Sequence, residues 1–598
     1  MIYLIDNSSN TKIPASHYQL GTIDDVVKYC EDKQVLGVDT ETEGLDFTCK
    51  KMIMFQIGDE IDQFVIDTRV VDIEPLRNIL ESTDIIKIFH NAKFDYKFIK
   101  RWGKIECEGI YDTFLTERVL NCGKDGVRYG LKDVCKNYLN VELNKEVRNQ
   151  FVGLTGQPFR EDQIVYGAKD VEYLIGVRKH QLPLIDKYKL NNVVALENEA
   201  VTAFADIEYN GLDLDSEKWK EIESVNMDKA SNLELNLDEM VRVDARIKHF
   251  VSRYVQTDMF TPVEEIRDID IKWTSPKQVL DVFQCLLPSL ENVNGKQMYK
   301  YRFKYPLIDK YVKYKEAMKL CTSYGDAFFK NLAGDNKIHT NFHQILDTGR
   351  VSSSKPNMQQ IPASNSYRNC FVSGYKDWVY VSSDYSSQEL AVIAFGSQDP
   401  VWLKALEEKK DLHSVCANLV YGPIWVNAAE DDCLFFRDDG DGGHIQQKCE
   451  CKAHKKLRTG VKSINFGLAY GMSEFKLSDT LQISTEEAGA LIKTYFSSFP
   501  KIKKFLDSLG AFGIQKGYIL TYAPYRRIRW FPKWKRGMTF KVRGEIERAS
   551  KNTPIQGASA DMTKQAMIYI REEIRDNNWP VKMVMTVHDQ IDTICHTD

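Results

Sequence analysis

Three short apolar runs of this 598-residue chain each lead into an acidic residue. VLGV precedes Asp39, WVYVSS precedes Asp384 and VKMVMTVH precedes Asp589. Runs of this length that are rich in β-branched residues or methionine are typical of strands. Carboxylates at strand ends can approach one another and share a metal ion. We therefore expect sheets whose ends carry metal-dependent chemistry.

Length and composition indicate an ordinary globular protein with several cores. The length predicts three to five domains, and 43% of residues are hydrophobic while 28% are charged. No apolar run reaches the ~18 residues that span a bilayer, and the first residues, MIYLIDNSSN, lack the pattern of a signal peptide. We expect a chain that stays in the cytoplasm and contacts no membrane. Its 13 cysteines, an odd number without regular spacing, are expected to be reduced thiols apart from one cluster.

The pattern of strands and helices changes twice along the chain. From about residue 35 to 185, runs such as QVLGVDT, KMIMFQIG, QFVIDT and IIKIFH alternate with helical stretches, which predicts an α/β layer. Residues 186 to 335 carry long amphipathic runs without strands and predict a helical module, in which Ser275 and Pro276 begin one helix. Strands and helices mix again from about residue 340.

The first acidic constellation lies in the α/β layer. Asp39 and Glu41 alternate along one strand and share a face, while Tyr166 precedes Asp170 by one helical turn. With Asp95, they supply four carboxylates and a phenol, which suits hydrolysis of a phosphodiester by two Mg²⁺ or Mn²⁺ ions about 4 Å apart. Taken singly, each could instead be a turn or a solvated helix face; their joint occurrence favours the catalytic interpretation.

The motifs DTET, HNAKFD and YGAKD resemble those of the DEDDy 3′-5′ exonuclease family, the proofreading module of DNA polymerases. The resemblance covers about residues 1 to 185. It implies that Asp39, Glu41, Asp95 and Asp170 hold the metal ions and that Tyr166 orients the attacking water.

The second constellation surrounds Asp384 and Asp589. Asp384 lies between a strand and the helical segment that contains Glu389, and Asp589 lies in a hairpin turn with His588. If one sheet brings the two junctions together, their carboxylates can hold two Mg²⁺ ions for phosphoryl transfer.

A helical segment between the two aspartates carries cations and rings at intervals of four. Residues four apart on a helix differ by only about 40° around its axis. One helix face would therefore carry Arg458, Lys462, Phe466 and Tyr470. The cations can bind triphosphate oxygens and the rings can stack on a base. Alternatively, the two rings could be buried core residues, and the two cations could lie along apolar surface with only their charged ends in solvent.

DYSSQEL, RTGVKSINFGLAYG and VHDQ resemble motifs A, B and C of the family A polymerases, the DNA polymerase I type. The resemblance implies that Asp384, Asp589 and the backbone of Tyr385 bind the metal ions and that Glu389 excludes ribonucleotides. It also implies that Arg458, Lys462, Phe466, Tyr470 and His413 bind the nucleotide. Further matching segments assign Arg350, Gln359, Arg548, Asn552, Gln556 and His588 to primer-template DNA.

Two features depart from the family pattern. Motif C has Gln590 where the family normally has glutamate, and Asp592 is expected to share its face. An insertion before motif B carries Cys433, His444, Cys449, Cys451 and His454, which are the residue types that bind zinc. Either a structural Zn²⁺ or free thiols would explain them.

The resemblance implies an α/β and α+β multidomain fold in which a ribonuclease H-like exonuclease domain precedes a right-hand polymerase domain. We expect the exonuclease at 1–185, the start of the polymerase domain and the thumb at 186–340, the palm at 341–400 and 541–598, and the fingers at 401–540. The compact layout, without a preceding 5′-nuclease domain, favours a bacteriophage-like enzyme that acts in a phage-infected bacterial cell. The sequence stops nine residues after Asp589, so either this lineage closes its palm differently or the sequence is shortened.

The expected activity is template-directed nucleotidyl transfer from dNTPs with proofreading, in phage genome replication. We expect a monomer that acts on primer-template DNA, with a processivity factor or replisome proteins as further candidate partners. One alternative is an exonuclease whose inactive polymerase domain acts as a DNA clamp. Another is a non-enzymatic DNA-binding scaffold, which two intact acid constellations disfavour because clustered carboxylates repel a phosphate backbone.

Overall fold

The computed structural model describes the chain except residues 7–16, 144–146, 155, 252–268, 363 and 598. The described residues form two compact units. Unit 1 contains 1–212, 333–360 and 375–598, and unit 2 contains 213–332 and 361–374. Part of the predicted helical module, 252–268, lies outside the described residues. No helix in the described ranges is long and apolar enough to cross a bilayer.

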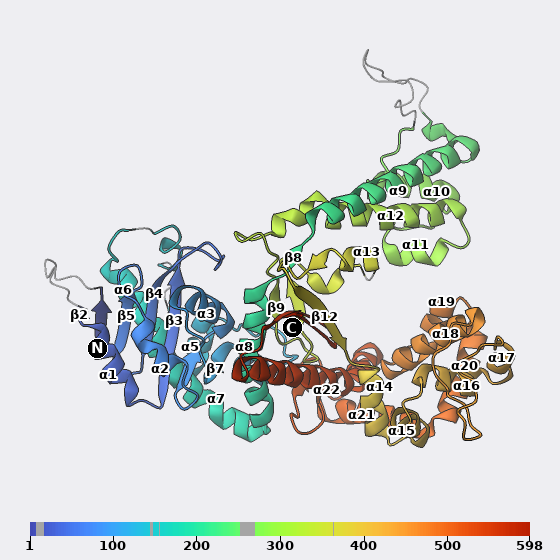
Figure 1. Cartoon of the computed structure of the whole chain (residues 1–598). Helices are drawn as coiled ribbons and strands as arrows, with labels where there is room; N and C mark the ends of the chain where they lie inside the picture. The colour runs from blue at the N-terminus through green and yellow to red at the C-terminus, as the bar shows by residue number, and fades with distance from the viewer. Residues whose placement is uncertain (7–16, 144–146, 155, 252–268, 363, 598) are drawn as a thin grey trace, which may run out of the picture. The chain divides into compact units, whose positions relative to one another are not determined.

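Unit 1 begins with a seven-stranded mixed sheet of order β2-β1-β5-β4-β3-β6-β7 (Figure 1). β4 runs antiparallel to both β3 and β5, and the other pairs are parallel. The four strands predicted from apolar runs, β3 to β6, are confirmed, whereas β1, β2 and β7 were not predicted. The strands are β1 (Ile2–Ile5), β2 (Gln19–Leu20), β3 (Val35–Thr42), β4 (Met52–Gly58), β5 (Gln63–Asp67), β6 (Ile86–Phe89) and β7 (Ile110–Asp112).

Helices cover this sheet and share its apolar core. Capping residues define several of their starts: Thr22 forms a capping box with Asp25, and the Asp112 carboxylate accepts from two backbone N–H groups. The helices are α1 (Ile23–Glu31), α2 (Arg77–Leu80), α3 (Ala92–Phe98), α4 (Thr113–Leu120), α5 (Leu131–Leu139), α6 (Glu161–Glu172), α7 (Leu174–Tyr188) and α8 (Asn191–Asn210).

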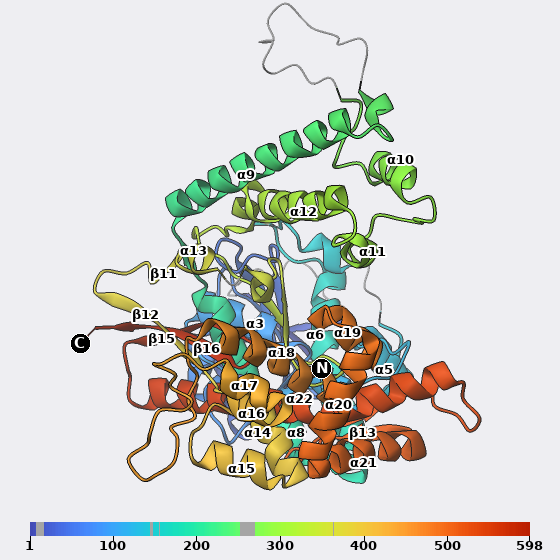
Figure 2. The same ribbon diagram turned by 90° about the vertical axis from the view of Figure 1, so that its right-hand side faces the viewer.

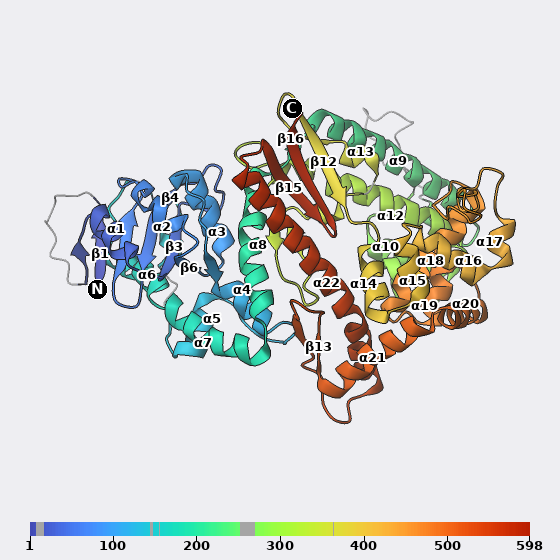
Figure 3. The same ribbon diagram turned by 60° about the horizontal axis from the view of Figure 1, so that its bottom comes forward.

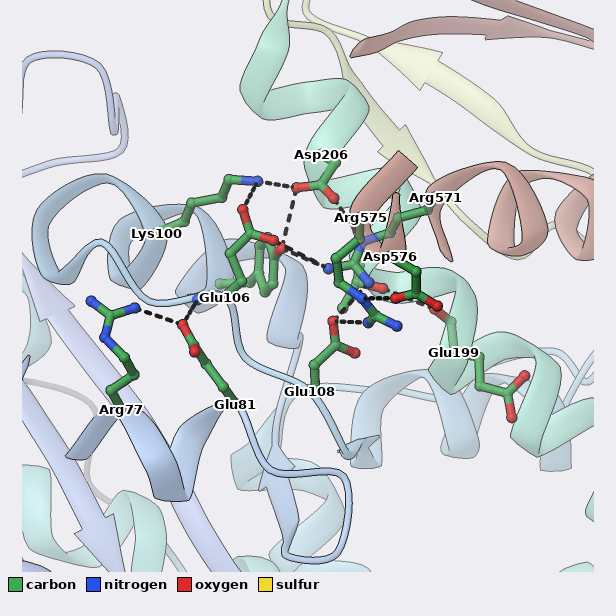
Figure 4. A network of polar contacts seen from close by, with 12 residues as sticks. Arg77, Glu81, Lys100, Glu106, Glu108, Glu199, Asp206, Arg571, Arg575 and Asp576 are labelled. Atoms are coloured by element: carbon green, nitrogen blue, oxygen red, sulfur yellow. Dashed lines mark hydrogen bonds and ion pairs between the residues drawn. The ribbon is translucent and has the colours of Figure 1, made fainter. Parts of the chain in front are cut away.

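A buried ionic network joins α8, the segment after α3 and the last helix of the chain, α22 (Phe540–Asp576). Arg571 of α22 donates from Nε to Asp206 of α8 at 2.7 Å and from Nη1 to Glu108 at 2.8 Å (Figure 4). Lys100 donates to the same Asp206 carboxylate at 2.6 Å. Burial would raise the pKa of Asp206, but Lys100 and Arg571 hold it below its usual value.

The second sheet of unit 1 is antiparallel and has the order β12-β16-β15 (Figure 3). β12 (Trp378–Asp384) pairs with β16 (Gln590–His596), which forms a hairpin with β15 (Val581–Val587). α8 and α22 contact this sheet. Short strands complete the region: β9 (Asn341–His343) pairs with β10 (Ser352–Ser354), and β13 (Tyr518–Leu520) with β14 (Ile528–Trp530).

Helices between β12 and β13 pack around a second apolar core (Figure 2). Trp402 and Trp425 are fully buried in it. The helices are α14 (Gln388–Ser397), α15 (Pro400–Glu407), α16 (Leu412–Tyr421), α17 (Pro423–Asn427), α18 (Lys452–Ala469), α19 (Glu474–Leu481), α20 (Thr485–Ser498) and α21 (Pro500–Lys516).

Unit 2 is mainly helical, as the amphipathic pattern predicts. Its helices are α9 (Ser216–Val243), α10 (Pro276–Leu286), α11 (Gly295–Tyr301), α12 (Pro306–Tyr324) and α13 (Asn365–Arg368). Ser275 is the N-cap of α10, although its side chain makes no capping hydrogen bond. The expectation that 186 to 335 contains no strand is wrong, because β8 (Asp213–Leu214) pairs with β11 (Phe371–Val372).

Candidate active sites

Three of the four carboxylates predicted for the first site lie together. Oxygen atoms of Asp39 and Glu41 on β3 and of Asp170 on α6 lie within 4.8 Å of one another. Glu41 and Asp170 are buried and Asp39 is half-buried. Such a group of oxygen ligands suits a hard divalent cation, which would offset the repulsion among the carboxylates.

Two glycines let α6 approach the sheet closely enough to form this group. A Cβ on Gly37 of β3 would lie 2.7 Å from the backbone oxygen of Val171, the residue after Asp170. A Cβ on Gly167 of α6 would lie 2.8 Å from the side chains of Met54 and Gln56 on β4. A side chain at Gly37 would push α6, and Asp170 with it, away from the strand, because the atom in its way is backbone; at Gly167 the Met54 and Gln56 side chains would have to move.

The other two residues predicted for this site are not in the group of three. Asp95 of α3 is buried and accepts a hydrogen bond from Thr40 Oγ1 at 2.6 Å, so it is linked to the residue between Asp39 and Glu41. The ring of Tyr166, one turn before Asp170 on α6, lies 6.0 Å from that of Phe151. The sequence alone did not reveal the Thr40 contact.

The second acidic pair is formed by neighbouring strand ends. Asp384 is the last residue of β12 and lies opposite Gln590, the first residue of β16. Asp589 and His588 form the two-residue turn between β15 and β16, and His588 has the positive φ of 60° that this turn requires. Tyr385 donates its backbone N–H to the Asp589 carbonyl at 3.4 Å. The predicted strand-to-helix junction and hairpin are therefore confirmed.

An open cavity of about 540 Å³ lies beside this pair. It collects predicted residues from β12, α14, α16, α18, the β15–β16 turn and the 350–359 segment. They are Arg350, Gln359, Asp384, Tyr385, Glu389, His413, Arg458, Lys462, Phe466, Tyr470, His588 and Asp589. The four residues spaced at intervals of four thus face one space, although Tyr470 is the C-cap of α18 rather than a helical residue.

Arg458 has a partner that the sequence did not identify. Its guanidinium donates from Nε and Nη2 to the two carboxylate oxygens of Asp411, each at 2.7 Å. Asp411 is also the N-cap of α16 and accepts from the Ser414 backbone N–H at 2.9 Å. Burial would raise the pKa of Asp411, but the bonds from Arg458 and Ser414 lower it, so the carboxylate stays ionised.

His413 is buried in the cavity wall and neutral. Burial, with the positive charges of Arg458 and Lys462, lowers its pKa to about 4. Its Nδ1 lies 3.0 Å from the side-chain nitrogen of Asn465. An amide nitrogen can only donate, so Nδ1 accepts and Nε2 carries the proton. Its ring also lies 5.9 Å from that of Phe466.

The residues predicted for the DNA are divided between the cavity and α22. Arg350 and Gln359 line the cavity, and Arg350 contacts Glu389 through its guanidinium. Arg548, Asn552 and Gln556 follow one another at intervals of four on α22. Arg548 lies against Gly471, directly after α18, where a Cβ would be 2.8 Å from its Cγ.

Further cavity residues come from the same helix, α22. Ser559, Ala560, Thr563, Lys564 and Met567 also line the space. They were not predicted from the sequence, although their three- and four-residue spacing indicates a common helix face.

Gln590 and Asp592 share a face, as alternation predicts. Gln590 donates from its amide to Asp592 Oδ1 at 2.6 Å, and Tyr380 donates to Oδ2 at 2.8 Å. Asp592 is buried and is not part of the cavity wall. The amide of Gln590 therefore satisfies a buried carboxylate next to the site.

Four of the five residues predicted for zinc lie together. They are Cys433, Cys449, Cys451 and His454, and all are buried. His444 is not part of the group: it is exposed, with its ring against Phe436 at 5.6 Å. The five candidates for one tetrahedral site are thus reduced to four, because residue 444 forms a β-bridge with Asp438 and is not in the group.

Two family models match the regions of the chain in which the residues of the two acidic sites lie. The sequence model of DNA polymerase family A matches residues 257–431 and 443–598, and that of the 3′-5′ exonuclease matches 18–185. DNA polymerase I of Borreliella burgdorferi is 26% identical over 596 residues, which cover 95% of this chain and 59% of that protein. DNA polymerase I of Rhizobium leguminosarum is 27% identical over 635 residues, covering 97% and 57%.

This chain thus spans about three fifths of the length of these two relatives. Among solved structures, the POL domain of Pol1 from M. smegmatis, in complex with DNA primer-template and dNTP, has the same fold. Its TM-score is 0.75 at 22% identity, and the match covers 96% of this chain and 91% of that one. The chain therefore belongs to DNA polymerase family A and carries a 3′-5′ exonuclease domain ahead of the polymerase domain.

Proposed function

We propose that this chain extends a DNA primer with dNTPs as directed by a template and removes mispaired 3′ nucleotides at a separate site. One observation carries the proposal: predicted residues from six separate segments line a single cavity beside Asp384 and Asp589. A second, independent group of carboxylates on β3 and α6 suits the exonuclease.

The donor atoms at both sites fit Mg²⁺ or Mn²⁺, since all are carboxylate or backbone carbonyl oxygens, which these cations prefer. Two such ions at each site, when bound, would lower the pKa of the attacking hydroxyl or water and offset charge on the phosphate. We assign Asp384, Asp589 and the Tyr385 backbone to one site and Asp39, Glu41, Asp95 and Asp170 to the other. Tyr166 would orient the water for hydrolysis.

The cavity residues would bind and select the nucleotide. Arg458 and Lys462 can hold triphosphate oxygens, and Phe466 and Tyr470 can stack on the incoming base. His413 can donate from Nε2 as a neutral group. Glu389, which lines the cavity, would exclude a ribose 2′-hydroxyl.

Primer-template DNA would lie along the cavity and α22. The structural relative from M. smegmatis was solved with DNA primer-template and dNTP. We extend this binding to Arg350, Gln359, His588, Arg548, Asn552 and Gln556. Hydrogen bonds from such side chains to minor-groove acceptors, which every base pair offers, would check pair geometry without reading sequence.

Primer extension and 3′ degradation, measured separately, test the proposal. We expect Asp384→Asn or Asp589→Asn to abolish extension and leave degradation intact, and Asp39→Asn with Asp170→Asn to do the reverse. Asparagine keeps the side-chain volume, so loss of both activities in either variant would contradict two separate sites.

An exonuclease with an inactive polymerase domain that clamps DNA is the alternative. Asp384, Lys462 and Asp589 are all present beside the cavity, which favours an active polymerase. Several further expectations stay predictions. They are the five domain ranges given above, a monomeric state, cytoplasmic localisation, a processivity factor and a role in phage genome replication.

A further inference from the structure

A buried group of three cysteines and one histidine lies at the start of α18, apart from both acidic sites. Its four ligand atoms lie within 4.8 Å of one another, and His454 is only 1% exposed. Around a tetrahedral zinc ion with Zn–S near 2.3 Å and Zn–N near 2.0 Å, ligand atoms lie roughly 3.5 to 3.8 Å apart. The group therefore has the right size for one ion.

The histidine is oriented for a metal by its surroundings. Its Nε2 lies 2.7 Å from the Trp425 carbonyl oxygen, which can only accept, so Nε2 carries the proton and Nδ1 has a free lone pair. Nδ1 lies 3.0 Å from Cys449 Sγ and 3.4 Å from Cys433 Sγ. The Trp425 ring stacks on the imidazole at 3.8 Å and 5°. Metal-binding histidines are held by such outer contacts.

We propose that Cys433, Cys449, Cys451 and His454 bind one structural Zn²⁺ ion that fastens the start of α18. Three sulfur ligands and one imidazole select zinc over the hard cations of the acidic sites. Four protein ligands complete a tetrahedron and leave no position for substrate, so the ion is structural rather than catalytic.

The ion would hold together the two ends of the segment from 434 to 448, because its ligands Cys433 and Cys449 flank this segment. The family match is interrupted from 432 to 442, so Cys433 and most of this segment lie outside the sequence that the family model matches. Cys451 is the N-cap of α18 and His454 is in its first turn. A zinc ion that joins Cys433 to the three later ligands would close a loop of the chain. Closing such a loop lowers the conformational entropy of the unfolded chain.

Two short series of contacts lead from the zinc site to Arg458, the residue that we propose binds the triphosphate. His454 and Arg458 are four residues apart on α18 and share a face. Gln446, three residues before Cys449, accepts a hydrogen bond from the Asp411 backbone N–H at 3.0 Å, and Asp411 holds Arg458. Zinc would therefore fix the guanidinium; this consequence rests on the proposed function.

Metal analysis of the purified full chain tests the site directly. We expect about one zinc per chain, and under about a tenth in Cys449→Ser and in His454→Gln. His444→Ala is the matched control, because His444 lies in the same insertion but outside the group, and it should retain the zinc. Cobalt substitution of the wild type should give the sulfur-to-metal charge-transfer band of a thiolate site.

Wild-type protein with under about a tenth of an equivalent of zinc, after expression and purification with zinc present, would overturn the site. So would a disulfide between two of these cysteines in protein purified under reducing conditions. The cobalt measurement needs no variant, so it decides the question even if Cys449→Ser does not fold.

Nucleotide kinetics test the connection to Arg458. Cys449→Ser should raise KM for dNTP several-fold and leave degradation of single-stranded DNA unchanged. An unchanged KM in a zinc-free variant would overturn the connection. A wild-type chain that holds zinc but extends no primer would refute the proposed polymerase function and leave the metal site standing.

Discussion

Arg350 and Glu389 contact each other directly, guanidinium to carboxylate, at the edge of the cavity beside Asp384. Arg350 precedes β10 and Glu389 lies in the first turn of α14, so the contact joins two segments that are distant in sequence. Glu389 is half-buried and held in place by this pair. A fixed side chain can exclude a substrate atom, whereas a mobile one would move aside.

We predict that Glu389→Ala raises incorporation of ribonucleotides relative to deoxynucleotides by at least about tenfold, because roughly 1.4 kcal/mol of discrimination suffices for that factor. Single-nucleotide extension with matched rNTP and dNTP measures the ratio. Glu389→Gln, which keeps the volume, should retain most of the discrimination. Equal ratios in Ala and wild type would show that another side chain excludes the 2′-hydroxyl.

Gly37→Ala should impair the exonuclease selectively. The new Cβ would meet the Val171 backbone oxygen at 2.7 Å, so α6 must shift and move Asp170 from Asp39 and Glu41. We expect degradation of single-stranded DNA to fall by about tenfold or more, since small displacements of catalytic groups have large effects. Primer extension should be unchanged.

Gly295→Ala is the control for this change, because a Cβ there meets nothing within 4 Å. Full exonuclease activity in Gly37→Ala would mean that the position of α6 does not determine the acidic site.

Acid should destabilise the chain through His413. Its pKa is about 4 in the folded state and near 6.5 when unfolded, so below pH 6.5 the unfolded state binds a proton that the folded state does not. Stability is therefore lost as pH falls from 6.5 towards 4, by about 2 kcal/mol at pH 5.

Urea unfolding at pH 7 and pH 5 measures this loss. His413→Gln cannot titrate, so its midpoint should fall less than that of the wild type between the two pH values. If the midpoint falls equally in the wild type and in His413→Gln, other groups cause the acid sensitivity.

Arg571→Met should lower the free energy of unfolding by about 3 kcal/mol, because it removes the cation that faces buried Asp206 and half-buried Glu108. Arg575→Met is the matched control, because Arg575 lies on the same helix as Arg571 and carries the same charge. Arg575 pairs with the same Glu108 but is 41% exposed, so we expect a loss under about 1 kcal/mol. Similar losses in both variants, measured by urea unfolding, would contradict a special role for the buried network.

The predicted local features correspond closely to the described structure. β3 to β6, the β15–β16 hairpin and the common face of Arg458, Lys462 and Phe466 follow from periods of two and 3.6 residues. Backbone geometry imposes these periods within a few residues, so a sequence pattern is enough to predict them. Motif resemblance added the family, which the sequence comparisons confirm.

Partners far apart in the chain were determined only by the tertiary structure. The sequence contains His444 and His454 as equal candidates, yet only His454 lies with the cysteines. Asp411 showed no sign of its pairing with Arg458, 47 residues away. Such choices depend on how helices and loops pack, and packing brings together side chains whose spacing in the sequence carries no periodic signal.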